Sequence, residues 1–112
     1  MDGTVMSKTV IACIDKAGKE PFTQWLNSLK DARSRRRILA RLRRIEQGNY
    51  GDCKHLQDGV FELRLFFGPG YRVYFGEDGN TVVVLLCGGD KSTQDKDIQT
   101  AVMYWKDYKG DA

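Results

Sequence analysis

The strongest structural signal in this chain is the segment VFELRLFFGPGYRVYF, residues 60–75. Apolar side chains alternate with others on both sides of Gly68-Pro69-Gly70, a run that is typical of a hairpin turn. The pattern predicts two antiparallel strands, residues 60–67 and 71–75, with Phe67 paired to Tyr71. One face then carries Phe61, Leu63, Leu65, Phe67, Tyr71, Val73 and Phe75. The other face carries Glu62, Arg64, Phe66, Arg72 and Tyr74.

The segments on either side of the hairpin predict the other elements. Before it come an apolar run and two segments with the three-and-four spacing of amphipathic helices, and after it come a second apolar run and a third helix. In chain order these elements are residues 9–14, 21–29, 31–47, 81–87 and 92–108. Residues 49–58 are expected to form a loop, and residues 81–87, apolar on both faces, are expected to form a central strand.

Local signals support the ends of these elements. Asp31 is the expected N-cap of the second helix. Ser92 or Thr93 is the expected N-cap of the third, and Asp95 completes a capping box with Ser92. The Gly88-Gly89 pair is expected to follow the end of the central strand.

Together these elements predict one α+β domain over residues 1–112. It would be a helical hairpin packed on a small antiparallel sheet, in the order β-α-α-β-β-β-α. Whether residues 1–8 are ordered stays open at this point. The 41% hydrophobic and 29% charged residues are typical of a globular protein and exclude a disordered or collagen-like chain.

The formal net charge of +3 hides a strongly basic segment. Residues 30–44 hold eight basic residues and one acid, a local charge of +7, whereas the rest of the chain sums to −4. The outward face of the second helix would carry Arg33, Arg37, Arg41 and Arg44. Such a stripe is typical of a surface for nucleic acid or an acidic partner, and equally of a solvated helix face.

Metal and cofactor chemistry finds no support in the sequence. The three cysteines form no metal-binding pair or cluster, and His55 is the only histidine. We therefore expect no metal and no cofactor. Unpaired thiols fit a reducing cytoplasm, and no apolar run reaches the length of a membrane span, so we expect a cytoplasmic protein with no membrane partner.

The polar face of the predicted hairpin is the candidate site. It gathers Glu62, Arg64, Arg72 and Tyr74, and Lys91 lies just past the central strand. Guanidinium groups suit bidentate phosphate binding, and Tyr74 or Phe66 would stack on a base. The alternative is a salt-bridged sheet face without a ligand, because Glu62 can pair with either arginine.

Three sequence elements carry a resemblance to a known family. They are Phe61-Glu62-Leu63-Arg64, Gly70-Tyr71-Arg72-Val73-Tyr74 and Gly88-Gly89-Asp90-Lys91-Ser92-Thr93-Gln94. From about Thr9 to Trp105 the chain resembles the addiction-module killer branch of the RelE/ParE toxin superfamily, which comprises HigB-like and phage Gp49-like proteins. The resemblance implies the same α+β fold.

The resemblance also implies a function, that of a toxin in a type II toxin–antitoxin module which cuts mRNA in the ribosomal A site without a metal. Its partners would be the 70S ribosome, mRNA and a HigA-like helix-turn-helix antitoxin. By motif position, Arg72 and Lys91 would act on the scissile phosphate and Arg64 on a flanking one. Glu62 is a candidate proton acceptor, and the arginine stripe of the second helix would dock on ribosomal RNA.

Two departures from RelE leave the proton transfer open. Glu62 stands where RelE has a second basic residue, and the last helix has no tyrosine before Tyr104. Tyr74, His55 or an acid of the last helix are the candidate substitutes. Two other functions remain as alternatives, because fold alone does not decide the target: a ParE-type inhibitor of gyrase, and an inactive interaction protein.

Overall fold

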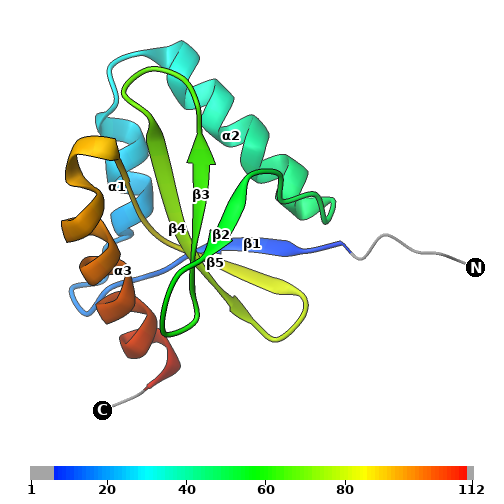
Figure 1. Cartoon of the computed structure of the whole chain (residues 1–112). Coiled ribbons are helices and arrows are strands. Elements are labelled where there is room, and N and C mark those ends of the chain that lie inside the picture. The colour runs from blue at the N-terminus through cyan, green and yellow to red at the C-terminus, as the bar shows by residue number, and fades with distance from the viewer. Residues whose placement is uncertain (1–6, 111–112) are drawn as a thin grey trace, which may run out of the picture.

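Helices cover both faces of a five-stranded sheet (Figure 1). The computed structural model describes residues 7–110. In chain order the elements are β1 (Thr9–Ala12), α1 (Pro21–Ser28), α2 (Ala32–Glu46), β2 (Cys53–His55), β3 (Val60–Leu65), β4 (Tyr71–Asp78), β5 (Val82–Asp90), the 3₁₀ helix η1 (Lys91–Thr93) and α3 (Gln94–Lys109). The strands lie in the order β1-β5-β4-β3-β2. This arrangement confirms the α+β class and adds one strand, β2, to the predicted succession.

The sheet differs from the prediction at its two edges. β2 forms inside the expected loop, where Cys-Lys-His lacks the apolar alternation that would reveal a strand, and it pairs antiparallel with the outer edge of β3. β1 lies at the opposite edge and runs parallel to β5, with Thr9 opposite Val82. The sheet is therefore mixed, and not antiparallel as predicted. Local periodicity does not report such a pairing, because the two strands lie far apart in sequence.

In the hairpin of β3 and β4, each side chain lies on the predicted face of the sheet, but the strands pair in a different register. Leu65, and not Phe67, pairs with Tyr71, so the expected pairing is wrong by two residues. A shift by two preserves the side on which each side chain points. β3 ends early because the turn is longer than predicted: Gly68 and Gly70 adopt positive φ angles of 56° and 79°, and the Gly70 N–H donates to the Phe67 carbonyl at 3.1 Å.

Two hydrophobic cores lie on the two faces of the sheet. The first packs α1 and α2 against the sheet and includes Phe22, Ile38, Ile45, Leu63, Val73 and Phe75. The second packs α3 against the other face and includes Val60, Tyr74, Val84, Leu86, Ala101 and Trp105. Figure 1 shows the strands lying between α2 and α3. The polar face of the β3–β4 hairpin therefore lies partly under α3 and is not an open surface.

β5 continues through the glycine pair that was expected to follow its end. The register slips opposite the step from Tyr74 to Phe75, where Leu86 is the extra residue of a bulge. Past this bulge, neither glycine leaves room for a side chain. A β carbon on Gly88 would lie 2.2 Å from the Trp25 ring, and one on Gly89 would lie 1.8 Å from the Asp97 carboxylate. The absence of side chains lets α1 and α3 approach the sheet at this end.

The helix caps are partly as predicted. The Asp31 carboxylate accepts the N–H of Arg33 at 2.9 Å, which confirms the cap of α2. The expected capping box of Ser92 and Asp95 is wrong. Asp90 caps η1 instead, accepting the Ser92 N–H at 2.8 Å, and α3 follows from Gln94.

The N-terminal end is described from residue 7 onward, so residues 1–6 lie outside the described part of the chain. Lys8 is held in place, because its backbone N–H donates to the Glu46 carbonyl at 2.8 Å. Cys13 and Cys87 are buried as small apolar residues, as predicted. Among residues 7–110, no helix combines the length and the apolar character needed to cross a bilayer.

Candidate functional site

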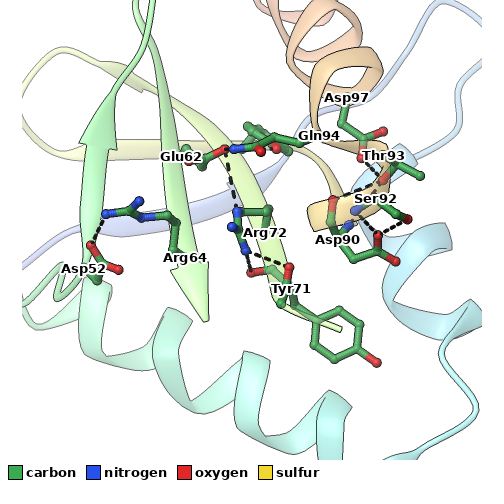
Figure 2. A network of polar contacts seen from close by, with 12 residues as sticks. Asp52, Glu62, Arg64, Tyr71, Arg72, Asp90, Ser92, Thr93, Gln94 and Asp97 are labelled. Atoms are coloured by element: carbon green, nitrogen blue, oxygen red, sulfur yellow. Dashed lines mark hydrogen bonds and ion pairs between the residues drawn. The ribbon is translucent and has the colours of Figure 1, made fainter. Parts of the chain in front are cut away.

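A buried carboxylate lies at the centre of the candidate site. Glu62 on β3 is 1% exposed and accepts hydrogen bonds from the Tyr74 hydroxyl at 3.1 Å and the Gln94 amide at 2.8 Å. The Arg72 Nε lies 3.9 Å from the same carboxylate oxygen. Figure 2 shows Glu62, Arg72 and Gln94 converging from β3, β4 and the start of α3. The sequence indicated Gln94 only as part of a motif. Its hydrogen bond to Glu62 forms because α3 packs over the sheet.

Arg72 is the cation of this network and is itself only 8% exposed. Its Nη1 donates to the Gly70 carbonyl at 2.7 Å, while its Nε makes no hydrogen bond to any residue that the structure describes. The contact with Glu62 is thus an ion pair without a direct hydrogen bond. A carboxylate at this depth needs a nearby cation, because leaving water costs an unpaired charge several kcal/mol. Arg72 consequently supports the fold as well as the site.

Tyr74 does not offer a surface to a ligand. It is fully buried, so the expectation that it stacks on a base is wrong. Burial, and next the charge of Glu62, raise the pKa of the Tyr74 hydroxyl well above its usual value. The hydroxyl therefore stays protonated near neutral pH and serves as a donor to Glu62, which does not suit a general base.

Replacing Tyr74 by phenylalanine removes this donor and keeps the ring. We expect the free energy of unfolding to fall by about 1–2 kcal/mol, since Glu62 loses one of its partners. Because the hydroxyl has no access to substrate, the rate of any RNA cleavage should change less than about three-fold. Chemical denaturation and a cleavage assay on the same protein measure both. A loss of activity without a loss of stability would show that Tyr74 acts in the chemistry.

Arg64 has a carboxylate of its own. Its Nη2 lies 3.1 Å from Asp52, a residue just before β2, and both side chains are about one-third exposed. The sequence suggested two arginines sharing one carboxylate, and Asp52 went unnoticed because it lies in the expected loop. The alternative of a salt-bridged sheet face is therefore right in part, since Arg64 lies next to Asp52 and Arg72 lies next to Glu62. Arg64 keeps enough exposure to reach a ligand.

Lys91 completes the basic group at this end of the sheet. It is exposed at the start of η1. A β carbon placed on Gly70 would lie 3.6 Å from the Lys91 β carbon and 3.2 Å from the Arg72 Nη1. Lys91 and Arg72 therefore adjoin the same point of the hairpin loop. Across the strands Arg64 and Arg72 are direct partners, so the structure brings together the three basic residues of the candidate site.

The arginine stripe of α2 is not uniform. Arg37, Arg41 and Arg44 line one open pocket with Phe66 and Phe67, whereas Arg33 lies outside it. Arg41 points inward and donates to the backbone carbonyls of Arg64, Tyr50 and Asp52, at 2.9, 3.1 and 3.4 Å. Burial lowers the pKa of Arg41. Arg41 thus fastens the loop before β2 to α2, and the prediction that it lies on an outward face is wrong.

The remaining proton-transfer candidates, His55 and Asp97, lie on opposite faces of the sheet. His55 on β2 is opposite Phe61, and their rings lie 4.8 Å apart on the α1–α2 side of the sheet. That side is opposite to Arg72, so His55 is not part of this site. The Asp97 carboxylate accepts the Thr93 hydroxyl at 2.5 Å above Gly89. No group of three or more potential metal ligands occurs among residues 7–110.

Comparison with known proteins assigns the family. The model of the family described as "Phage derived protein Gp49-like (DUF891)" matches residues 24–106, which include all candidate residues. The chain belongs to the Gp49-like family. An uncharacterised protein of Haemophilus influenzae (strain Rd) is 54% identical over 80 residues, which cover 71% of this chain and 81% of that protein.

The Gp49-like family lies within the RelE toxin–antitoxin superfamily, so the resemblance seen in the sequence is confirmed. This Gp49-like chain is thereby related to toxin–antitoxin systems. The match begins inside α1 and ends inside α3, and it therefore contains both helical layers and four of the strands.

Proposed function

We propose that the chain is the toxin of a type II toxin–antitoxin module and cleaves mRNA on the ribosome. Membership of the Gp49-like family supports the toxin assignment. The observation that carries the ribonuclease assignment is a succession of neighbouring basic residues. It runs from the pocket on α2 past Arg64, whose guanidinium carbon lies 5.9 Å from the Phe66 ring, to Arg72 and Lys91.

Such a succession suits the phosphates of a single RNA strand. The exposed cations Lys91 and Arg64 are able to hold two phosphates directly, with the charge of Arg72 between them. In the proposed step the 2′-oxygen attacks the adjacent phosphorus, its proton leaves, and the bond to the 5′-oxygen breaks as that oxygen gains a proton. A cyclic phosphate and a free 5′-hydroxyl result. Cations fixed near the phosphate stabilise the negative charge that develops in the transition state.

Glu62 has a supporting part in this proposal. Its carboxylate is buried and accepts two hydrogen bonds, from Tyr74 and Gln94. In this proposal Glu62 is therefore a positioning residue, and not the proton acceptor that the sequence suggested. Glu62 holds the charge of Arg72 at the end of β4, and Gln94 links that pair to α3.

The proposed partners are the ribosome and an antitoxin with a helix-turn-helix domain. Arg33, Arg37 and Arg44, which are exposed on α2, supply a surface that would contact ribosomal phosphates, in a manner strongly dependent on salt. An acidic antitoxin segment would neutralise the toxin by covering the same cations. The formal charge of +7 on residues 30–44 is the property on which both contacts depend.

Brief expression followed by mapping of transcript ends tests the proposal. The expected result is growth arrest with new 5′ ends inside translated messages, phased by codon and absent when translation is blocked beforehand. Broken DNA with intact mRNA would instead identify a gyrase inhibitor. Normal growth and intact messages would identify an inactive protein that retains the fold. Co-expression of the neighbouring gene product should restore growth if it is the antitoxin.

A further inference from the structure

We propose that the pocket between α2 and the end of β3 binds single-stranded RNA, with one unpaired base stacked on Phe66. The pocket measures about 370 Å³ and is lined by Arg37, Arg41, Arg44, Phe66 and Phe67. This inference deepens the proposed function, on which the choice of RNA as the nucleic acid rests. It adds a base-binding position that lies outside the Arg64, Arg72 and Lys91 group.

Phe66 is the most unusual side chain of the pocket. It is 76% exposed at the point where β3 ends, although a phenylalanine normally loses most of its surface on folding. Its neighbour Phe67 turns back and packs on Tyr71, with ring centroids 5.4 Å apart. An exposed ring beside cations is the combination that proteins use to stack on unpaired bases.

The arginines of the pocket divide into two kinds. The guanidinium carbon of Arg37 lies 3.9 Å from the centre of the Phe67 ring, so its planar face is held by a cation–π contact. Arg44 is exposed two helical turns further along, roughly 10 Å away along the axis. The Nη1 and Nη2 groups of Arg41 donate to backbone carbonyls. Arg37 and Arg44 therefore supply the phosphate contacts, and Arg41 supplies fixed charge.

The shape of the pocket favours RNA over an acidic protein segment. A protein helix or strand that binds tightly needs a broad apolar surface to bury. Here the exposed apolar surface is the Phe66 ring and the small Ala40 side chain, beside a second ring already covered by Arg37. A stacked base needs only one ring. Duplex RNA is disfavoured as well, because its bases are already stacked on one another.

The test measures binding of a fluorescein-labelled oligouridine to the full chain by anisotropy, without ribosomes. Phe66→Leu keeps an apolar side chain but removes the ring, and should weaken binding by about ten-fold. Phe66→Trp keeps a stacking surface and should bind as the unchanged protein does. Because Phe66 is exposed, circular dichroism should show the same fold for all three proteins.

A spacing-matched pair of double variants tests the cations. R37Q/R44Q removes the two proposed phosphate contacts and should both weaken binding and make its salt dependence shallower by roughly one to two units of log slope. R36Q/R43Q removes the same charge from exposed positions seven residues apart on the same helix, outside the pocket. It should bind within about three-fold of the unchanged protein, since long-range attraction alone is screened at physiological salt.

Three outcomes would overturn this inference. They are oligouridine binding that is equal in Phe66→Leu and the unchanged protein, equal weakening by the two double variants, and duplex RNA that binds as tightly as the single strand. Displacement of the RNA by an oligoglutamate peptide with no effect of Phe66→Leu would indicate an acidic protein partner instead. Mapping of transcript ends tests the proposed function independently of this binding assay. Binding that depends on Phe66 without mRNA cleavage would overturn the proposed function alone, and cleavage without such binding would overturn the pocket alone.

Discussion

Replacing Arg72 by alanine is expected to lower the free energy of unfolding by about 3 kcal/mol and to abolish mRNA cleavage. The loss of stability follows from Glu62, which is 1% exposed and would lose the cation that lies beside it. From the sequence, where Arg72 faces away from the apolar side of the hairpin, one would expect the fold to be untouched. The cover formed by α3 changes that expectation. Denaturant titration and a translation-coupled cleavage assay measure the two effects.

Two further variants separate the two roles of Arg72. In R72A/E62Q no charge is left unpaired, so the double variant should regain part of the lost stability while remaining inactive. Arg72→Lys keeps a cation near Glu62 and should lose less stability, yet it lacks the planar guanidinium and should lose most of the activity. A stable and fully active Arg72→Ala protein would contradict both the burial argument and the proposed site.

Replacing Lys91 by alanine is expected to give the opposite combination of effects. Lys91 is exposed at the start of η1, so stability should change by less than about 0.5 kcal/mol. If its ammonium group contacts the scissile phosphate, the cleavage rate should fall by about 100-fold, the typical effect of losing one group that stabilises transition-state charge. Single-turnover cleavage on programmed ribosomes measures the rate.

Lys96 provides the matched control for Lys91. It is an exposed lysine on the first turns of α3, near enough to share the long-range field but not placed next to Arg72. Lys96→Ala should therefore cleave within about three-fold of the unchanged protein. If Lys91→Ala and Lys96→Ala had equal effects, general attraction of RNA would explain the role of Lys91, and the proposed phosphate contact would be wrong.

Much of the fold could be predicted because local periodicity reports which side chains share a face. The alternation in residues 60–75 separated Leu63, Val73 and Phe75 from Glu62 and Arg72 correctly, even though the pairing register was wrong by two residues. An even shift leaves each side chain on its own face. Pairing partners were predicted less well, since neither the short strand β2 nor the parallel contact of β1 with β5 has a local signal.

The candidate site was predicted in its members but not in its environment. Motif position and hairpin faces grouped Arg64, Arg72 and Lys91, and in the structure Lys91 and Arg72 adjoin the same point of the hairpin loop. The partners Asp52 and Gln94 come from segments more than ten and thirty residues away from Arg64 and Glu62, as their separations of 12 and 32 show. Such contacts depend on how whole elements pack, which spacing within one element does not report.

Local sequence was enough to predict the apolar and polar faces of the hairpin, the three amphipathic helices, and a basic second helix in an otherwise acidic chain. Those properties depend on neighbouring residues and so can be recognised locally. The packing of α3 over the polar face became known only from the three-dimensional arrangement, and it makes Glu62 and Tyr74 a buried support for Arg72. The same three-dimensional arrangement turns Arg41 inward and leaves Phe66 exposed beside Arg37 and Arg44. These outcomes follow from the packing of distant segments, because burial changes the energetic role of a charge without changing the residue that carries it.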